Sequence, residues 1–244
     1  MTTVLKLGGS VITDKSREET VDDRSLDRVA AAIGDAADSR LVLVHGAGSF
    51  GHTYASAYNV TTTNGTRDPA AICAIHDSMK RLNVAVLDAL ADYDVPAVPV
   101  HTLSAAVRDA ESNLTLLTEQ IETMIEEGFV PVLHGDVIAH AGSGATIVSG
   151  DELVVELATQ LSATRVGLCS TVPGVLDADD RVIFEIADYA TVADVLGESD
   201  SPDVTGGMAG KVRALLALDA DAWIFGLDDV PAFLDGEATG TVIR

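Results

Sequence analysis

Short apolar segments alternate with longer helical patterns along the whole chain of 244 residues. Short runs rich in Val, Leu and Ile, bounded by glycine or polar residues, are typical of buried parallel strands. The sequence predicts such strands at Val4–Leu7, Leu41–Val44, Ala97–Val100, Val130–Leu133, Arg165–Leu168, Ala222–Phe225 and Thr241–Ile243. It predicts helices at Leu26–Ala37, Pro69–Ala91, Leu114–Glu127, Glu152–Leu161 and Gly207–Leu218. This order favours an α/β fold in which helices cover both faces of a mostly parallel sheet.

The segments between these elements carry cap and loop signals. Asp68 suits a helix N-cap, and Pro69 suits the first helical position after it. Thr61–Asp68 and Asp194–Pro202 are predicted to be polar loops, and no low-complexity linker divides the chain. At about 100–200 residues per domain, a chain of this length makes one large domain or two small ones.

The charge balance argues against a nucleic-acid partner and indicates a protein that works in concentrated salt. Asp and Glu total 38 against 15 Lys and Arg, which gives a net charge of −23, and the acids are scattered along the chain. Nucleic acid is a poor partner for such a surface, because phosphate binding needs clustered Lys and Arg. At about 1 M salt the Debye length falls to about 3 Å, which screens the repulsion among the acids. We expect a halophilic protein; the alternative is an ordinary acidic mesophilic one.

Cysteine usage and hydropathy predict a cytoplasmic protein. Cys73 and Cys169 lie far apart and form no CxxC pair, so both are expected to be reduced thiols. No apolar run approaches the roughly 18–20 residues of a membrane span. The first residues lack the charged region and long apolar stretch of a signal peptide.

Lysine is scarce, which makes the remaining lysines informative. The chain contains only Lys6, Lys15, Lys80 and Lys211. Lys80 falls in a predicted helix and is expected to be solvated, whereas the other three lie in or beside glycine-rich turns. Those three lysines are the candidate catalytic residues.

Two glycine-rich turns follow the first two predicted strands. The first is Gly8-Gly9-Ser10, directly after Lys6, where glycines let backbone N–H groups approach a phosphate. The second is His45–His52, which reads HGAGSFGH and contains GxGxxG. It is not read as a dinucleotide fingerprint, because the region about 20 residues on is a polar loop and not a strand ending in an acid. His52 could donate to a phosphate oxygen.

Two further turns open predicted helices. Ser149-Gly150-Asp151 places an acid at a helix start, where it could cap the helix or position lysine ammonium groups. Asp203–Lys211 resembles a Walker A loop but lacks its first glycine and its final Ser or Thr. It still offers glycine N–H groups and a lysine at a helix start.

Taken together, these turns indicate phosphoryl transfer. That reaction mainly requires positioning and neutralising the charge that spreads over the phosphoryl oxygens, which several N–H nests, three lysines and one acid can do. For each turn alone a structural role is the alternative: a tight turn, a histidine bonded to backbone, or a capping acid. His101, His134 and His140 lack zinc spacing and are expected to be structural, so no metal site is predicted on the protein.

The motifs resemble the amino acid kinase superfamily and, within it, the isopentenyl phosphate kinase family. The resemblance rests on KLGGSVITDK (6–15), HGAGSFGH (45–52), SGD (149–151), DVTGGMAGK (203–211) and GTVIR (240–244), so it spans the chain. It implies an open αβα sandwich with one continuous sheet, an acceptor-binding lobe at 1–162 and an ATP-binding lobe at 163–244. It also implies a homodimer that uses ATP and Mg²⁺ to phosphorylate isopentenyl phosphate in isoprenoid synthesis by a mevalonate-type pathway.

The resemblance also implies roles for single residues. The catalytic set would be Lys6, Lys15, His52, Asp151 and Lys211, with Lys15 stabilising the transferring phosphoryl group and Asp151 orienting the lysines. The nucleotide would contact Lys6, Gly8, Gly9, Ser10, Gly48, Thr171, Gly207 and Lys211. The acceptor would contact Ala47, Gly51, His52 and Gly150. Ile72, Ile75 and Ile147 are proposed for the wall of an apolar slot around the isopentenyl tail, with ordinary core positions as the alternative.

One departure from the superfamily leaves some contacts open. Many members carry TDVDG in the nucleotide lobe, where this chain reads STVPG at 170–174 and has neither acid. The rival functions are a kinase of another small phosphate or phosphonate, such as a fosfomycin-type kinase, and a nucleotide-binding regulator without catalysis. An amino acid kinase, a uridylate kinase and a dinucleotide-dependent oxidoreductase are weaker alternatives.

Overall fold

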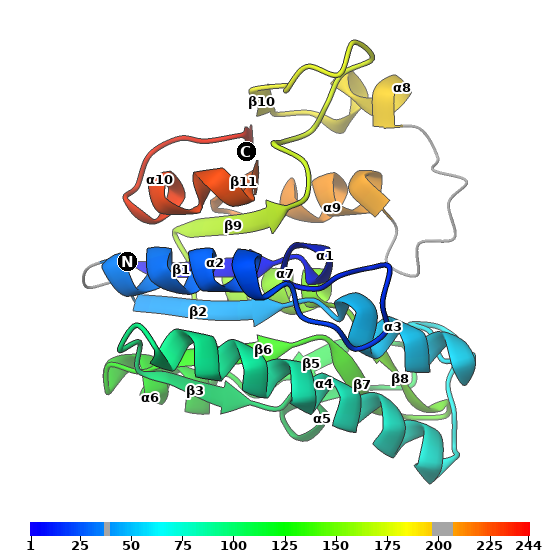
Figure 1. Cartoon of the computed structure of the whole chain (residues 1–244). Coiled ribbons are helices and arrows are strands. Elements are labelled where there is room, and N and C mark those ends of the chain that lie inside the picture. The colour runs from blue at the N-terminus through cyan, green and yellow to red at the C-terminus, as the bar shows by residue number, and fades with distance from the viewer. Residues whose placement is uncertain (37–39, 197–206) are drawn as a thin grey trace.

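The computed structural model describes residues 1–36, 40–196 and 207–244. Its main sheet has eight strands in the order β10-β12-β11-β9-β1-β2-β6-β3 (Figure 1). Neighbours pair in parallel except β11 and β12, which are antiparallel. In chain order the strands are β1 (Thr2–Leu7), β2 (Arg40–His45), β3 (Ala97–Val100), β6 (Val130–His134), β9 (Arg165–Ser170), β10 (Glu185–Ile186), β11 (Asp221–Gly226) and β12 (Thr241–Ile243).

A second, smaller sheet lies beside the carboxyl ends of β6 and β3. It has the order β5-β4-β7-β8, in which only β4 and β7 are parallel neighbours. Its strands are β4 (Ala106–Arg108), β5 (Leu114–Leu116), β7 (Asp136–His140) and β8 (Gly144–Val148). The turn from β6 into β7 at Gly135 joins the two sheets in sequence.

Helices cover both faces of the main sheet, as Figure 1 shows. The longer helices are α2 (Asp23–Asp35), α3 (Gly48–Ala57), α4 (Pro69–Ala91), α6 (Glu119–Glu126), α7 (Gly150–Gln160) and α9 (Gly207–Leu215). The shorter ones are α1 (Gly9–Ile12), α5 (Thr102–Ala105), η1 (Tyr189–Thr191), α8 (Ala193–Leu196), η2 (Leu227–Asp229) and α10 (Val230–Leu234). Among the described residues, no helix has both the length and the apolarity needed to cross a lipid bilayer.

Alternating strand residues divide the core into two layers. On one face of β1, Leu5 and Leu7 pack with α2, α4 and α10. On the other face, Val4 packs with α6, α7 and α9. Because side chains alternate along a strand, Lys6 projects to the same face as Val4, towards α7. The pattern of β1 therefore directs one lysine to the helix that carries Asp151.

Most of the predicted elements are confirmed, with shifts of a few residues at their ends. Pro69–Ala91 is helical over its predicted span, and the Asp68 carboxylate accepts a hydrogen bond from Ala70 N–H as an N-cap. The sheet is mostly parallel, as predicted, and Lys80 is a partly exposed helical residue paired with Asp77. The predicted end of the first long helix at Ala37 lies outside the described residues; the helix ends at Asp35.

Three local predictions are corrected by the structure in part or in full. The predicted helix Leu114–Glu127 begins only at Glu119, because Leu114–Leu116 is strand β5 and pairs with β4. The predicted helix at Glu152 begins two residues earlier, at Gly150, because Ser149 caps it. The predicted loop Asp194–Pro202 begins inside α8, and its residues 197–202 lie outside the described part of the chain.

Candidate active site

The carboxyl ends of the parallel strands β9, β1, β2 and β6 open onto one cavity of about 680 Å³. The chain leaves β1 towards β2 on one side, while β9 pairs with β1 on the other, so the strand order reverses beside β1. Ligands of open α/β sheets bind outside the carboxyl ends of strands at such a switch point. The topology therefore places a ligand site where the glycine-rich turns lie.

The turns after β1 and β2 lie in direct contact. A Cβ added to Gly9 would lie 2.1 Å from the backbone nitrogen of Gly48. Gly48 itself has φ +50, and a Cβ there would lie 2.1 Å from Oγ1 of Thr13. The Thr13 hydroxyl donates to Gly9 C=O at 2.7 Å and accepts from Ser49 N–H at 3.0 Å. Only glycine allows this approach, and Thr13 joins the two turns.

A capped helix supplies the third side of the cavity. Ser149 Oγ accepts from Glu152 N–H at 3.2 Å, and the Glu152 carboxylate accepts from Ser149 N–H at 2.8 Å. This reciprocal capping box fixes the first turn of α7. Gly150 and Asp151 follow the cap directly and line the cavity.

Two lysines from distant parts of the sequence meet at Asp151. Lys6 Nζ lies 2.6 Å from Asp151 Oδ1, and both side chains are largely buried. Lys211 Nζ lies 3.7 Å from Asp151 Oδ2. Two ammonium groups and one carboxylate leave an excess of one positive charge at the wall of the cavity. The carboxylate holds the two lysines together, and the remaining charge favours an anionic ligand.

Backbone N–H groups add further donors. Within the described residues, no hydrogen bond from the N–H groups of Gly9, Ser10, Ala47, Gly48, Gly150 or Asp151 to another protein group is present. These groups belong to the first turns of α1, α3 and α7 or to the residue just before one of them. Helix N-termini leave such donors unused and favour negative charge. Three helix starts thus face the same cavity as Lys6 and Lys211.

The rim of the cavity carries Lys15 and His52. Lys15 is exposed on the loop after α1, and His52 is exposed in the second turn of α3. Arg17 also lines the rim, and its Nε donates to Asp14 at 2.8 Å. Hydrogen bonds from Ser16 and Arg17 lower the pKa of Asp14 to about 2. The rim therefore adds cationic and hydrogen-bonding side chains above the lysine pair.

One wall of the cavity is apolar. Ile75 from α4, Ile147 from β8 and Met79 from α4 line it. Ile75 is buried in a small cluster with Ala55, and Ile147 packs against that cluster. Ile72 packs against the same cluster but does not line the cavity. The apolar wall lies on the His52 side of the site, since Ala55 belongs to the same helix as His52.

The cavity contains nearly all of the residues expected from the sequence. Its lining includes Lys6, Gly8, Gly9, Ser10, Lys15, Ala47, Gly48, Gly51, His52, Ile75, Ile147, Gly150, Asp151, Thr171 and Lys211. Gly207, which was expected at the nucleotide, begins α9 and is not part of this lining. Residues 203–206 of the fourth turn lie outside the described residues.

Sequence reasoning expected His101 and His134 to be structural, but it missed that they cluster with His45 and His76 behind the site, where His45 and His134 are fully buried. His134 Nδ1 bonds Gly135 C=O at 3.1 Å, and His101 Nδ1 lies 3.2 Å from His134 Nε2. His76 Nδ1 lies 2.7 Å from Asp136 Oδ2, and Asp136 lines the cavity. The ring of His45 lies 5.4 Å from that of His134. The sequence contained a signal for this cluster. His134-Gly135-Asp136 follows a predicted strand and has the same Gly-Asp pair as Ser149-Gly150-Asp151.

Burial shifts the pKa values of this cluster in opposite directions. Desolvation lowers the pKa of His45 and lowers that of His134 well below 6.5. Desolvation raises the pKa of Asp136 above 3.8. Below about pH 6.5 the unfolded chain therefore takes up histidine protons that the folded chain does not, and stability falls. Asp136 acts oppositely, since its folded form takes up a proton first.

We expect the free energy of unfolding to drop between pH 7.5 and 5.5, and the His134→Gln variant to lose less over that range. Each buried histidine contributes at most about 1.4 kcal/mol per pH unit, so the difference in loss is about 1 kcal/mol. Urea unfolding at the two pH values measures it. An equal pH-dependent loss in the variant would show that His134 is not held neutral by burial.

Comparison with known proteins agrees with this geometry. Residues 1–220 match the model of the amino acid kinase family. An isopentenyl phosphate kinase of Haloferax volcanii is 61% identical over 242 residues, covering 99% of this chain and 98% of that protein. One of Methanothermobacter thermautotrophicus is 36% identical over 88% of this chain and 86% of its own length. A solved structure titled as an isopentenyl phosphate kinase superposes over both full chains with a TM-score of 0.85 at 31% identity.

Proposed function

The chain belongs to the amino acid kinase family and, within it, to the isopentenyl phosphate kinases, and we propose that it transfers the γ-phosphoryl group of ATP to isopentenyl phosphate. The meeting of Lys6, Asp151 and Lys211 beside three helix N-termini carries this proposal. Phosphoryl transfer requires positioning and charge neutralisation, and this site offers both. The products are isopentenyl diphosphate and ADP.

The acceptor end of the site suits a phosphate bound to an apolar tail. The Ala47 N–H group and the His52 side chain offer donors to the acceptor phosphate. Ile75 and Ile147 offer an apolar wall next to them. Because a phosphate monoester is already largely ionised near neutral pH, no general base is needed to make it a nucleophile. This separates the site from that of a kinase acting on a hydroxyl.

The proposed reaction is an in-line displacement. An oxygen of the acceptor phosphate forms a bond to the γ-phosphorus, the bond from that phosphorus to the β–γ bridging oxygen breaks, and ADP leaves with the electron pair. Lys6 and Lys211, held by Asp151, would neutralise the charge on the moving phosphoryl group and on ADP. Lys15 would add a positive charge from the rim. The nucleotide would also contact Gly8, Gly9, Ser10, Thr171 and Gly207.

Mg²⁺ fits this site as a companion of ATP. Among residues 1–36, 40–196 and 207–244, no cluster of three or more His, Cys, Asp or Glu side chains is suited to hold a metal. Mg²⁺ commonly binds substrate phosphates and water with one or two carboxylates, and Asp151 is the carboxylate beside the lysine pair. When bound, the ion would supply charge neutralisation at the β- and γ-phosphates.

The experiment is an acceptor panel with ATP and Mg²⁺ in high salt, followed by ³¹P NMR. The panel contains isopentenyl phosphate, isopentenol, fosfomycin, UMP and acetylglutamate. We expect a diphosphate product and ADP with isopentenyl phosphate at the highest kcat/KM, and no product with isopentenol. Turnover only with another acceptor would overturn the substrate assignment. ATP binding without turnover of any acceptor would favour a non-catalytic regulator.

His52→Ala separates acceptor binding from nucleotide binding. The variant removes a side-chain donor at the expected acceptor end. His52 lies after β2 and the expected nucleotide contact Thr171 lies after β9, and these two strands flank β1. We expect KM for isopentenyl phosphate to rise at least tenfold, because a hydrogen bond to a charged group such as a phosphate contributes about 1.5–3 kcal/mol. The Kd of ATP, measured by calorimetry, should change less than twofold. Equal weakening of both ligands would remove His52 from the acceptor site.

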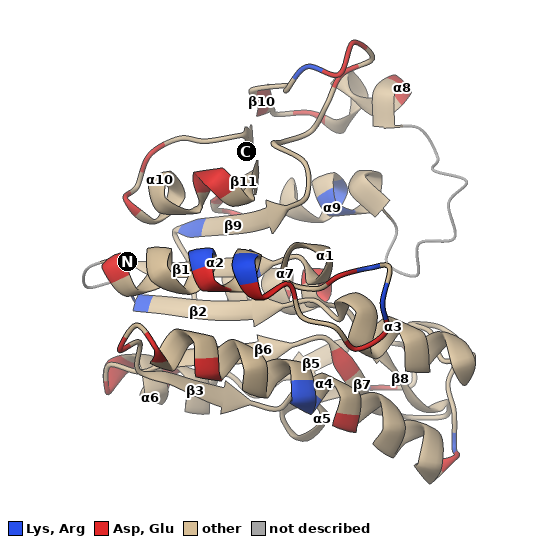
Figure 2. Ribbon diagram, in the orientation of Figure 1, with Lys and Arg blue, Asp and Glu red and all other residues tan. Residues whose placement is uncertain are grey.

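The charge of the surface bears on the setting in which the enzyme works. Figure 2 shows acidic residues spread over helices, strands and loops throughout the described chain. Such a surface supports a halophilic, cytoplasmic enzyme, because concentrated salt screens its self-repulsion. We expect the midpoint of thermal unfolding to rise between 0.1 M and 2 M KCl, as followed by circular dichroism.

We also propose that residues 1–162 form an acceptor lobe and residues 163–244 a nucleotide lobe. The enzyme is proposed to be a homodimer.

A further inference from the structure

A buried arginine lies behind the first turn of α7. Arg108 ends strand β4 in the smaller sheet, and only 6% of its side chain is exposed. Its Nη1 donates to Ser112 C=O at 3.3 Å. Its Nε is buried and has no hydrogen-bond partner among the described residues. A buried guanidinium is costly unless it is paired, so its partners indicate why it is there.

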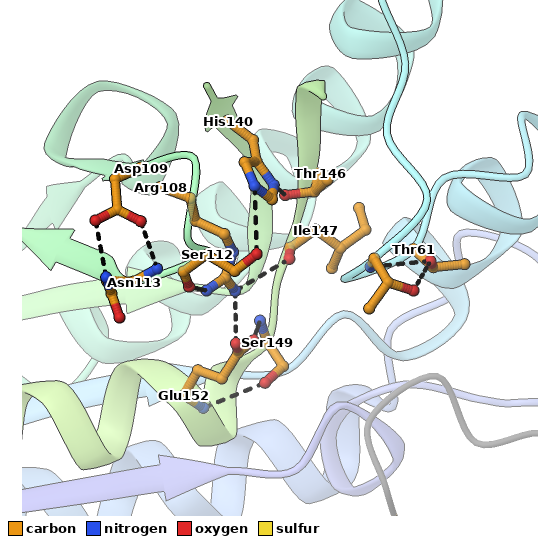
Figure 3. A network of polar contacts seen from close by, with 11 residues as sticks. Thr61, Arg108, Asp109, Ser112, Asn113, His140, Thr146, Ile147, Ser149 and Glu152 are labelled. Atoms are coloured by element: carbon orange, nitrogen blue, oxygen red, sulfur yellow. Dashed lines mark hydrogen bonds and ion pairs between the residues drawn. The ribbon is translucent and has the colours of Figure 1, made fainter. Parts of the chain in front are cut away.

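Two of the segments that Arg108 contacts also line the active-site cavity. Nη2 donates to Glu152 Oε1 at 2.5 Å and to the Ile147 C=O at 3.5 Å. Figure 3 shows the guanidinium between Ile147 at the end of β8 and Glu152 at the start of α7. Ile147 lines the cavity, and its N–H donates to Thr61 C=O at 2.9 Å.

The other oxygen of the Glu152 carboxylate connects this arginine to the reacting centre. Glu152 Oε2 accepts from Ser149 N–H at 2.8 Å and completes the capping box. The next two residues are Gly150 and Asp151, and Asp151 holds Lys6 and Lys211. A shift of the first turn of α7 would therefore move Asp151 and both lysines together.

We propose that Arg108 is a positioning residue of this active site, which fixes Asp151 through Glu152 and the acceptor wall through the Ile147 carbonyl. The inference rests on the proposed kinase function. Arginine suits this role because its planar fork donates to a carboxylate and a carbonyl at once, whereas lysine acts as a point charge. A displacement of about 1 Å at a reacting centre can cost about 100-fold in rate.

The test measures kcat per folded enzyme for Arg108→Met, Asp151→Asn and the double variant, with ATP and isopentenyl phosphate. We expect Arg108→Met to lower kcat about 10- to 100-fold and to change the KM for ATP little. In the Asp151→Asn background the same substitution should lower kcat less than threefold, because Asp151 is already disabled, whereas the KM for isopentenyl phosphate, which reports on the wall at Ile147, should rise in both backgrounds. Arg108→Lys should recover part of the loss.

A purely structural role would give a different pattern. Arg108→Met would then lower the folded fraction, seen by near-UV circular dichroism, and leave kcat per folded enzyme unchanged, or its effect would multiply with that of Asp151→Asn. Either result overturns the inference. If Arg108→Met does not fold, Glu152→Gln carries the same cycle, since it removes the ion pair and keeps an acceptor for Ser149 N–H.

The matched control is Arg28→Met, which removes an equal charge from an ion pair with Asp228 on the surface. Its kcat should equal that of the parent enzyme. The parent enzyme also separates the two hypotheses. If it does not turn over isopentenyl phosphate, the proposed function fails; if it does and Arg108→Met matches it, only the present inference fails.

Discussion

We expect the Lys6→Met variant to lose kcat by about 100- to 1,000-fold, which corresponds to about 2.7–4 kcal/mol of transition-state stabilisation. Lys6 Nζ lies 2.6 Å from Asp151 in a cavity wall, and its side chain is largely buried. Solvent therefore cannot easily compensate for the loss of its positive charge. Its loss also leaves the Asp151 carboxylate with less positive charge beside it, facing the anionic substrates. Steady-state kinetics on the folded variant measures the effect.

Lys80→Met is the matched control for Lys6. Lys80 lies on α4 with 42% of its side chain exposed and pairs with Asp77 at 2.7 Å, so the substitution removes the same charge from the same kind of side chain. Its kcat should stay within twofold of the parent value, because exposed ion pairs contribute little. We expect Lys15→Met and Lys211→Met to lower kcat by intermediate factors. A Lys6→Met variant as active as Lys80→Met would remove Lys6 from the mechanism.

Gly9→Ala should damage folding and catalysis together. The added Cβ would lie 2.1 Å from Gly48 N and 2.7 Å from Gly48 Cα, and both are backbone atoms that no side-chain rotation can move. The two turns must separate, at a cost of about 3 kcal/mol or more in the free energy of unfolding. The N–H groups of both turns can then no longer bind the phosphates in one geometry, so kcat of the remaining folded enzyme should fall at least about 100-fold.

Gly226→Ala provides the control for this substitution. A Cβ at Gly226 would meet its nearest neighbour at 3.5 Å, which is ordinary van der Waals contact. Its urea midpoint should stay close to that of the parent protein, whereas that of Gly9→Ala should fall clearly. If both midpoints agree, the turns after β1 and β2 do not lie in contact as described.

The parallel sheet and most of the site could be predicted because their signals are local. The central strands are short, mainly apolar runs, and each of the four turns keeps its glycines and polar residues within a few positions. Because the chain has only four lysines, few lysine side chains had to be considered as catalytic residues. The Ser149–Glu152 capping-box pattern is present in the sequence but was not used, which is why the start of α7 was predicted two residues late.

Other features depend on contacts between distant residues and left no local signal. Leu114–Leu116 is a strand because it pairs with β4, although its apolar spacing also fits the helix that follows. Helix α3 begins at Gly48 without a side-chain cap and contains Gly51, which packs against Met79. Arg108 and Glu152 are 44 residues apart, so their ion pair appears only in the folded chain.

The most direct measurement is a crystal structure with a non-hydrolysable ATP analogue and isopentenyl phosphate. We predict that the γ-phosphate lies within hydrogen-bond distance of Lys6 Nζ and the turn at Gly9, with the acceptor phosphate in line beside His52 and the isopentenyl tail against Ile75 and Ile147. Phosphates bound elsewhere, with Lys6, Asp151 and Lys211 contacting neither of them, would contradict the mechanism derived from this cavity.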